Sequence, residues 1–143
     1  MANRNETVRF AMRLTHLADY AVVMMSAAAR REEGERLSAT VLAEETGVPL
    51  PTAQKLMQSL GKAGLLKGQR GAGGGYVLAR PVTEISLADI VEAVEGPIAL
   101  TQCSEGVSDC ALDALCKVKP HMGIVGEKVR GALGAVSLQE LSK

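Results

Sequence analysis

Apolar residues recur at helical spacing early in the chain. From Leu14 to about Arg31 they fall three and four positions apart, as Leu17, Ala18, Ala21, Met24, Met25 and Ala28. This spacing predicts one amphipathic helix, because residues three and four apart share a helical face. A polar, charged turn is expected over 32–36, and residues 1–11 are expected to be an extension.

Two shorter helices are predicted next. Ser38 suits an N-cap and Gly47 suits a C-terminal stop, so a short helix is expected between them. Pro51 suits a first helical turn, and the stretch up to Gly64 has a buried stripe of Ala53, Leu56, Met57, Leu60 and Ala63. The other face of this third helix is polar or basic, with Thr52, Gln54, Lys55, Gln58, Ser59 and Lys62. Such a pair of helices is typical of a helix-turn-helix.

A glycine-rich stretch follows the third helix. Leu65-Leu66-Lys67 and Tyr76-Val77-Leu78 are strand candidates, and residues 68–75 between them read Gly-Gln-Arg-Gly-Ala-Gly-Gly-Gly. We therefore predict a β-hairpin that projects as a wing. A nucleotide-binding loop is disfavoured, because Tyr76 stands where a Rossmann fingerprint needs its third glycine and no Gly-Lys-Ser/Thr follows to make a P-loop.

The second half of the chain is less regular. Ser86 and Asp89 resemble a capping box, which predicts a short helix over 86–96. Residues 101–120 show no sustained period and are predicted to form a loop. Over 122–136 apolar residues again recur at helical spacing, although four glycines weaken this last helix.

Charge is distributed unevenly, although the formal net charge is zero. Residues 1–80 carry eleven Lys/Arg and seven Asp/Glu, whereas residues 81–143 carry five and nine. The stretch 48–80 contains no acidic residue, and its cations are Lys55, Lys62, Lys67, Arg70 and Arg80. An acid-free basic stretch is typical of a surface that faces phosphates.

The side chains of this stretch favour double-stranded DNA as the ligand. Glutamine can pair with adenine edges, lysine and arginine reach guanine or phosphate, and threonine or serine contacts either. The expected contacts are Thr52, Gln54, Lys55, Gln58, Ser59 and Lys62 on the third helix and Arg70, Gly73 and Gly74 on the wing. With Phe10, Tyr20 and Tyr76 as the only aromatic residues, the chain lacks the stacking platform of single-strand binders.

All three cysteines lie in the segment without a period. Cys103, Cys110 and Cys116 are separated by six and five residues. Thiolates are soft ligands that suit an iron–sulfur cluster or zinc, and a loop can wrap three of them around one centre. Redox-active thiols are the alternative. His121 is the nearest nitrogen ligand for a fourth position, and the oxygen alternatives are Glu105, Asp109 and Asp113.

Enzyme and membrane functions are disfavoured. The two histidines lie outside any recognisable catalytic signature, so no acid–base or Ser/His/Asp set can be assembled. No secretory signal is visible, and the apolar run 21–29 is too short to cross a bilayer before Arg30 and Arg31 end it. We expect a cytoplasmic protein that is not an enzyme and has no membrane partner.

These motifs together resemble the Rrf-type bacterial transcription regulators. The resemblance rests on Met12-Arg13-Leu14-Thr15, Asp19-Tyr20-Ala21-Val22, Lys62-Ala63-Gly64-Leu65-Leu66 and the wing motif from Arg70 to Arg80, and it extends to about Val136. It is strongest for members that regulate the sulfur-mobilisation (SUF) system of iron–sulfur assembly. It implies a homodimer in which a long C-terminal helix crosses to the partner, with a cluster loop between that helix and the DNA-binding head.

The resemblance also bears on the cluster. Members with a 2Fe-2S centre use three cysteines and commonly a histidine after two intervening residues, a place that Lys119 occupies here. A shifted loop would let His121 take the fourth position, or an acidic residue would take it. A 2Fe-2S centre is favoured and a 4Fe-4S centre is possible. Cysteine-biosynthesis repressors of the family lack the three cysteines, which disfavours that branch.

The predicted fold is mainly α with a small β wing, a winged helix-turn-helix with a C-terminal dimerisation helix. The expected parts are the extension 1–11, the DNA-binding domain 12–80, a linker helix region 81–100, the cluster loop 101–120, and the dimerisation helix and tail 121–143. We expect a homodimer that binds a double-stranded DNA operator and senses iron–sulfur or redox status. The rivals are a zinc- or thiol-based regulator with the same head and a small iron–sulfur electron carrier.

Overall fold

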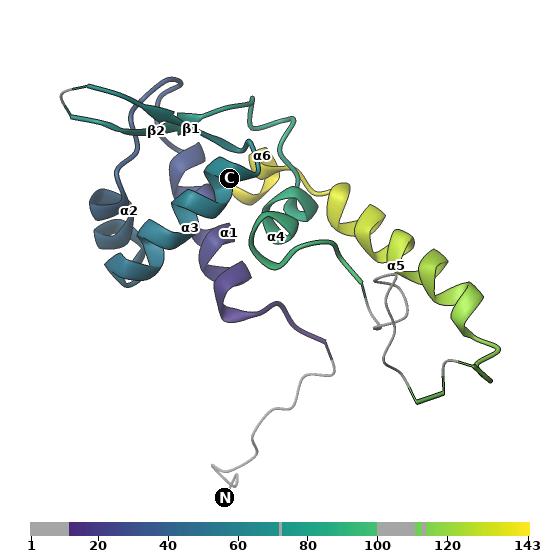
Figure 1. Cartoon of the computed structure of the whole chain (residues 1–143). Helices are drawn as coiled ribbons and strands as arrows, with labels where there is room; N and C mark the ends of the chain where they lie inside the picture. The colour runs from purple at the N-terminus through teal and green to yellow at the C-terminus, as the bar shows by residue number, and fades with distance from the viewer. Residues whose placement is uncertain (1–11, 72, 100–110, 113) are drawn as a thin grey trace, which may run out of the picture.

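The computed structural model of the chain describes residues 12–71, 73–99, 111–112 and 114–143 (Figure 1). The elements in order are α1 (His16–Ala29), α2 (Ala39–Thr46), α3 (Leu50–Lys62), β1 (Leu66–Gln69), β2 (Gly75–Leu78), α4 (Leu87–Glu95), α5 (Lys119–Gly134) and α6 (Leu138–Leu141). β1 and β2 pair antiparallel, with Leu66 opposite Leu78 and Gln69 opposite Gly75. The fold is thus mainly α with a small β wing, as predicted.

The predicted helix ends are confirmed at several residues. The side chain of Ser38 accepts a 3.1 Å hydrogen bond from the N–H of Val41 and so caps α2. Gly47 ends α2 with φ +78°, a conformation that glycine adopts without strain. Ser86 and Asp89 form the expected capping box at the start of α4.

The core is built from aliphatic and methionine side chains, as the scarcity of aromatic residues requires. Its largest fully buried members are Met24, Met25, Leu42, Leu56, Met57, Leu60, Leu65, Ile85, Ile90 and Leu138. They come from α1, α2, α3, the base of the wing, α4 and α6, so one core unites these elements. The apolar stripes that the periodicity predicted on separate helices therefore pack into one core. We call the unit that shares this core, α1 to α4 with the wing and α6, the head.

The end of the chain returns to this head. The N–H of Leu87 donates to the carbonyl of Val136 at 2.8 Å, and the N–H of Leu138 donates to the carbonyl of Ile85 at 2.7 Å. The hydroxyl of Ser26 on α1 donates to the carbonyl of Leu141 at 2.9 Å. The expected division treated this segment as a tail, but the buried side chain of Leu138 makes it part of the core. A four-residue helix is too short to show a period in the sequence.

α5 differs from every helix of the head. It begins at Lys119, so the expected loop 101–120 extends two residues too far, and Pro120 sits in the first turn, where its missing N–H costs nothing. Gly126 is its one buried residue. Figure 1 shows α5 extending away from the head on the side opposite the wing.

Within the described ranges, none of the helices is both long enough and apolar enough to span a membrane.

Candidate nucleic-acid interface and cysteine segment

α3 presents one packed face and one polar face. Ala53, Leu56, Met57 and Leu60 are at most 2% exposed, and this packing fixes the rotation of the helix. Four of the predicted contact residues are exposed: Gln54, Lys55, Gln58 and Lys62. Thr52 and Ser59 are half-buried, and the hydroxyl of Ser59 donates to the carbonyl of Lys55 at 3.2 Å. The polar face is therefore carried mainly by two glutamines and two lysines.

The wing and α3 meet along a shallow groove of about 350 Å³. Its lining residues are Gln58, Gly61, Lys62, Leu66, Gly68 and Tyr76. A Cβ at Gly61 would lie 3.3 Å from Cε1 of Tyr76, so this ring packs closely on the end of α3. Tyr76 was predicted only as a strand residue, because no local pattern shows that its ring faces α3. The groove places two predicted contacts of the helix, Gln58 and Lys62, beside the wing, whereas the predicted wing contacts Arg70, Gly73 and Gly74 do not line it.

A third segment completes the wing. The N–H of Leu37 donates to the carbonyl of Tyr76 at 2.6 Å, and the N–H of Tyr76 donates to the carbonyl of Leu37 at 2.9 Å. Gly75 has φ +136°, and a Cβ there would lie 2.6 Å from the carbonyl oxygen of Leu37. Only glycine satisfies both constraints, so Gly75 is required by the pairing of Leu37 with the wing.

The tip of the wing has an unusual backbone. Gly71 and Gly73 have φ values of +112° and +77°, and the N–H of Gly74 donates to the carbonyl of Gly71 at 3.0 Å. Arg70, Gly73 and Gly74 are all exposed. A turn rich in glycine lets the backbone approach a ligand closely.

Arg80 lies at the base of the wing, away from its tip. Its Nη2 is 3.7 Å from Oδ2 of Asp89 on α4. Of the cations in 48–80, Arg80 is the one for which the described part of the chain shows an ion pair. The last cation of the acid-free stretch is therefore paired with a carboxylate from outside the stretch.

Three carboxylates of α4 reach three different elements. Asp89 contacts Arg80, Glu92 Oε1 is 2.5 Å from Nε of Arg130 on α5, and Glu95 accepts a hydrogen bond from the hydroxyl of Thr15, the N-cap of α1. These residues are spaced three apart and so follow one side of α4. α4 thereby connects the wing base, α5 and the start of α1.

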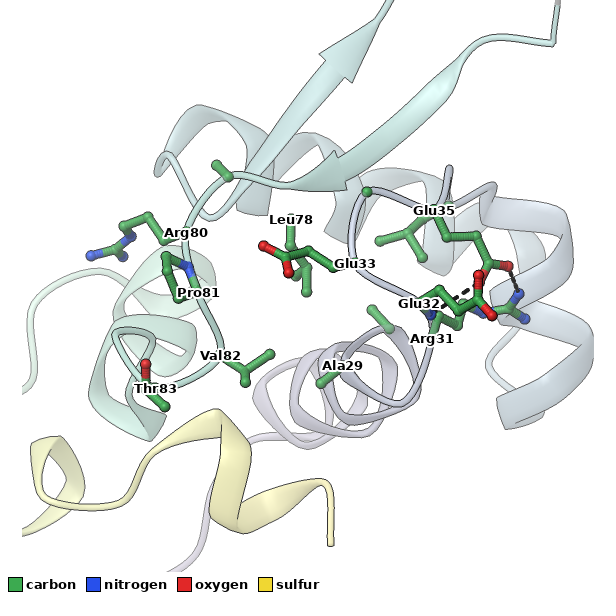
Figure 2. Close-up of a pocket in the computed structure, with 14 residues that line it drawn as sticks. Ala29, Arg31, Glu32, Glu33, Glu35, Leu78, Arg80, Pro81, Val82 and Thr83 are labelled. Atoms are coloured by element: carbon green, nitrogen blue, oxygen red, sulfur yellow. Dashed lines mark hydrogen bonds and ion pairs between the residues drawn. The ribbon is translucent and has the colours of Figure 1, made fainter.

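A cavity of about 390 Å³ lies between the end of α1, the following loop and the exit of β2 (Figure 2). The side chains of Ala29, Leu78 and Val82 border it, and Glu33 extends over it. Arg31 is turned toward α2, 2.8 Å from Glu35 and 2.6 Å from Glu45. The hydrogen bonds that Arg31 donates to Glu45 and Glu35 raise its pKa. Sequence reasoning predicted no cavity here, because its walls come from separate segments.

The predicted cluster ligands are described only in part. Cys103 and Cys110 lie outside the described residues, as do the alternative ligands Glu105, Asp109 and Asp113. Cys116 is a half-buried free thiol just before α5, and His121 is exposed in the first turn of that helix. The described residues contain no group of three or more His, Cys, Asp or Glu suited to a metal ion.

The helix-turn-helix, the wing and the groove between them define a winged-helix DNA-binding protein. A family model of iron-dependent transcriptional regulators, named Rrf2, matches residues 14–143. The chain belongs to this family and is a DNA-binding transcription regulator, not an enzyme.

The family includes relatives with solved structures and curated names. The transcriptional regulator IscR of Xenorhabdus nematophila is 32% identical over 132 residues, which cover 92% of this chain and 80% of that protein. The solved structure of CymR, the global cysteine regulator of B. subtilis, has a TM-score of 0.69 at 26% identity and covers 92% of this chain and 96% of CymR. The solved structure of T. potens IscR has a TM-score of 0.68 at 26% identity, with 92% and 86% covered. The predicted resemblance is thus confirmed.

Proposed function

We propose that the chain is a homodimeric regulator whose affinity for a two-fold DNA operator depends on an iron–sulfur cluster held by Cys103, Cys110 and Cys116. The proposal for DNA rests on one observation above the others, the groove in which Gln58 and Lys62 of α3 meet Gly68 and Tyr76 of the wing. A helix in the major groove with a wing beside it needs both elements on one side of the protein.

The roles of the individual contacts follow from their chemistry. Gln54 and Gln58 read bases, because glutamine can donate to and accept from one adenine edge. Lys55, Lys62 and Arg70 bind phosphate or guanine, and Thr52 and Ser59 support them. The turn at Gly73 and Gly74 approaches the adjacent groove or backbone, where a side chain would hold it away.

The cluster proposal rests on the donor set. Three thiolates suit iron–sulfur or zinc chemistry, and Cys116 lies just before the N-terminus of the sixteen-residue α5, where the helix dipole favours an anion. Relatives named IscR share the fold and most of the chain length. When bound, a 2Fe-2S centre, or alternatively a 4Fe-4S centre, would supply a redox-sensitive group. His121 is the proposed fourth ligand, with Glu105, Asp109 and Asp113 as alternatives.

A thiol-based switch is the second candidate. CymR, a cysteine regulator, is similar in fold, and a solved structure of Staphylococcus aureus CymR is described as an oxidized form. In this case the cysteines of the chain would respond by oxidation without a metal. Zinc in place of a cluster is the third possibility, because it takes the same ligands.

The dimer proposal rests on exposed apolar residues of the C-terminal arm, which we define as 111–134. Ile124 and Val125 on α5 are 55% and 39% exposed, and Leu112, Leu115 and Val118 before it are 67%, 86% and 55% exposed. A helix with apolar residues and almost no buried face is typical of one that needs a partner. A second copy of α5 is the proposed partner, with α5 as the dimerisation part and 12–80 as the DNA-binding part, because the residues after α5 pack on the head.

Contacts between the arm and the head provide a route for coupling. Arg130 of α5 pairs with Glu92 of α4, and Asp89 of the same helix pairs with Arg80 at the wing base. A change in α5 on cluster loss would shift α4 and thereby the wing relative to α3. The cluster site and the DNA-binding site would then both act on α4. A coupling free energy between two sites requires such a shared element.

The experiment is anaerobic purification followed by an absorption spectrum, iron and acid-labile sulfide assays, and affinity measurements on a duplex selected from a randomised pool. We expect a coloured protein whose duplex affinity changes by roughly 5- to 150-fold on cluster removal, the usual range of allosteric coupling. Zinc without colour would establish the zinc alternative. Absence of both metals would leave the thiol switch, and failure to bind any duplex would refute the DNA assignment.

Replacing Cys110 with Ala should abolish the cluster and its effect on DNA affinity, because two thiolates from a loop cannot retain it. Folding and dimerisation should persist, since the described core contains no cysteine. The matched variant His121→Ala should keep a more labile or redox-shifted centre, which the spectrum and potential would report. A Cys110→Ala protein that retains iron and sulfide would contradict the ligand set.

A further inference from the structure

We propose that Arg36, in the loop between α1 and α2, is a DNA-backbone contact of the wing. This inference deepens the proposed DNA-binding function and depends on it. The sequence pattern predicts that residue 36 lies in a charged turn, and it does not connect this turn with the wing, which begins thirty residues later. The structure joins the two through the pairing of Leu37 with Tyr76.

The pairing places the loop along the free edge of β2. Both the N–H and the carbonyl of Tyr76 are bonded to Leu37, at 2.9 and 2.6 Å. Because the N–H and carbonyl of one strand residue point to the same edge, β1 occupies the other edge of β2. The loop before α2 therefore pairs with the outer edge of the wing through a single bridge at Leu37, and Gly75 permits this close approach because it lacks a Cβ.

Strand alternation then sets the direction of Arg36. Glu35 and Leu37 line the cavity beneath the wing, whereas Arg36 between them does not. Leu37 is 3% exposed and Arg36 is exposed, as expected for neighbours on opposite faces of a strand. Arg36 thus points away from the head's interior.

The guanidinium lies beside the wing tip. A Cβ built on Gly73 would be 3.8 Å from Nη1 of Arg36, and Gly73 is one of the tip glycines proposed to approach DNA. Arg70 enters the same turn from the other strand. The glycine turn is therefore bracketed by two arginines, Arg70 just after β1 and Arg36 from the loop that pairs with β2.

Two carboxylates near this loop are held by another arginine. Glu35 and Glu45 are both bound by Arg31, at 2.8 and 2.6 Å, and Arg31 faces α2. A planar guanidinium beside a backbone turn suits phosphate, which arginine binds through two parallel hydrogen bonds. Arg36 would add sequence-independent affinity where the wing meets the DNA backbone.

The test uses the full-length protein and two duplexes, one selected from a randomised pool by the wild type and one unselected. Arg36→Gln should weaken binding to both duplexes by a similar factor, roughly three- to tenfold at low salt. It should also reduce the salt slope, the slope of the logarithm of DNA affinity against the logarithm of salt concentration, by about one per protomer. Arg36→Lys should retain most of the slope. The control Lys143→Gln removes the same charge at the exposed chain end and should change neither quantity.

A merely structural role for Arg36 predicts a different result. Arg36→Gln would then lower the melting temperature or weaken binding while leaving the salt slope unchanged, and that outcome would overturn the inference. In the wild type, bound duplex should protect Arg36 from modification by phenylglyoxal, read by mass spectrometry, and equal reactivity with and without duplex would also overturn it. If Arg70→Gln lowers the slope and Arg36→Gln does not, only this inference fails. If the wild type binds neither duplex, the proposed function itself fails.

Discussion

The head and the arm use apolar residues in opposite ways. In α1, seven of fourteen residues are buried against the rest of the head, whereas in α5 one of sixteen is buried. Apolar surface removed from water stabilises a fold by roughly 25 cal/mol per Å². The head therefore obtains its stability within one chain, but the arm leaves apolar surface that a second molecule can cover. Under the proposed function, this division would let the arm change its packing while the DNA-binding head stays rigid.

The strongest test of this difference between head and arm is to shorten one apolar side chain in each of them. Leu56→Ala should cost about 2–5 kcal/mol of unfolding free energy, because the side chain is 2% exposed and its loss leaves a cavity. Ile124→Ala, at 55% exposure, should leave the melting temperature of the separated protomer nearly unchanged and weaken dimerisation. Denaturant unfolding and sedimentation at several concentrations would measure the two effects. Equal losses of stability from both changes would contradict the division.

Glycine replacement should have opposite signs in the two regions. Gly75→Ala should destabilise the wing by about 1–3 kcal/mol, because φ is +136° and the new Cβ meets the carbonyl of Leu37 at 2.6 Å. Gly131→Ala should stabilise α5 by up to about 1 kcal/mol, since its helical backbone leaves nothing within 4 Å of the new Cβ. Thermal melts would report both, and duplex binding should fall only for Gly75→Ala. A neutral result at Gly75 would mean that the Leu37 pairing is dispensable.

Substitutions on the polar face of α3 should distinguish residues that set sequence specificity from residues that set overall DNA affinity. Gln54→Ala should reduce discrimination among sequences by about 1–3 kcal/mol if the glutamine reads a base. Lys62→Ala should weaken all sequences about equally and lower the salt slope. Competition binding with selected and unselected duplexes distinguishes the two. If neither change alters affinity for the selected duplex, α3 is not the recognition helix.

The smallest effect concerns the contact between arm and head. Glu92→Gln removes one ionic partner of Arg130, and the half-exposed arginine limits the cost to roughly 0.2–1 kcal/mol. The more informative measurement is the change in duplex affinity on cluster removal, which should shrink if this pair carries the coupling. The control Glu127→Gln alters an exposed carboxylate of α5 and should leave the coupling intact.

Several features were predictable because their signals are local. The caps at Ser38 and Ser86 and the stop at Gly47 each depend on residues within one or two helical turns. The same holds for the buried stripe of α3, although its last predicted member, Ala63, lies beyond the helix and is exposed. The start of α5 was placed two residues late, because a lysine and a proline show no apolar period. α6 was missed because four residues are too few to show a period, although Leu138 is fully buried.

The sequence by itself determined α1 to α5, the wing and the three cysteines, because periodicity, capping and ligand chemistry depend on neighbouring residues. The tertiary structure alone decided that Leu37 pairs with Tyr76, that Arg80 turns toward Asp89 and that the chain end packs on α1. These contacts join residues far apart in the chain, and no local pattern records them. They form because separate stripes must share one core, and that shared burial brings Arg36 beside the wing tip.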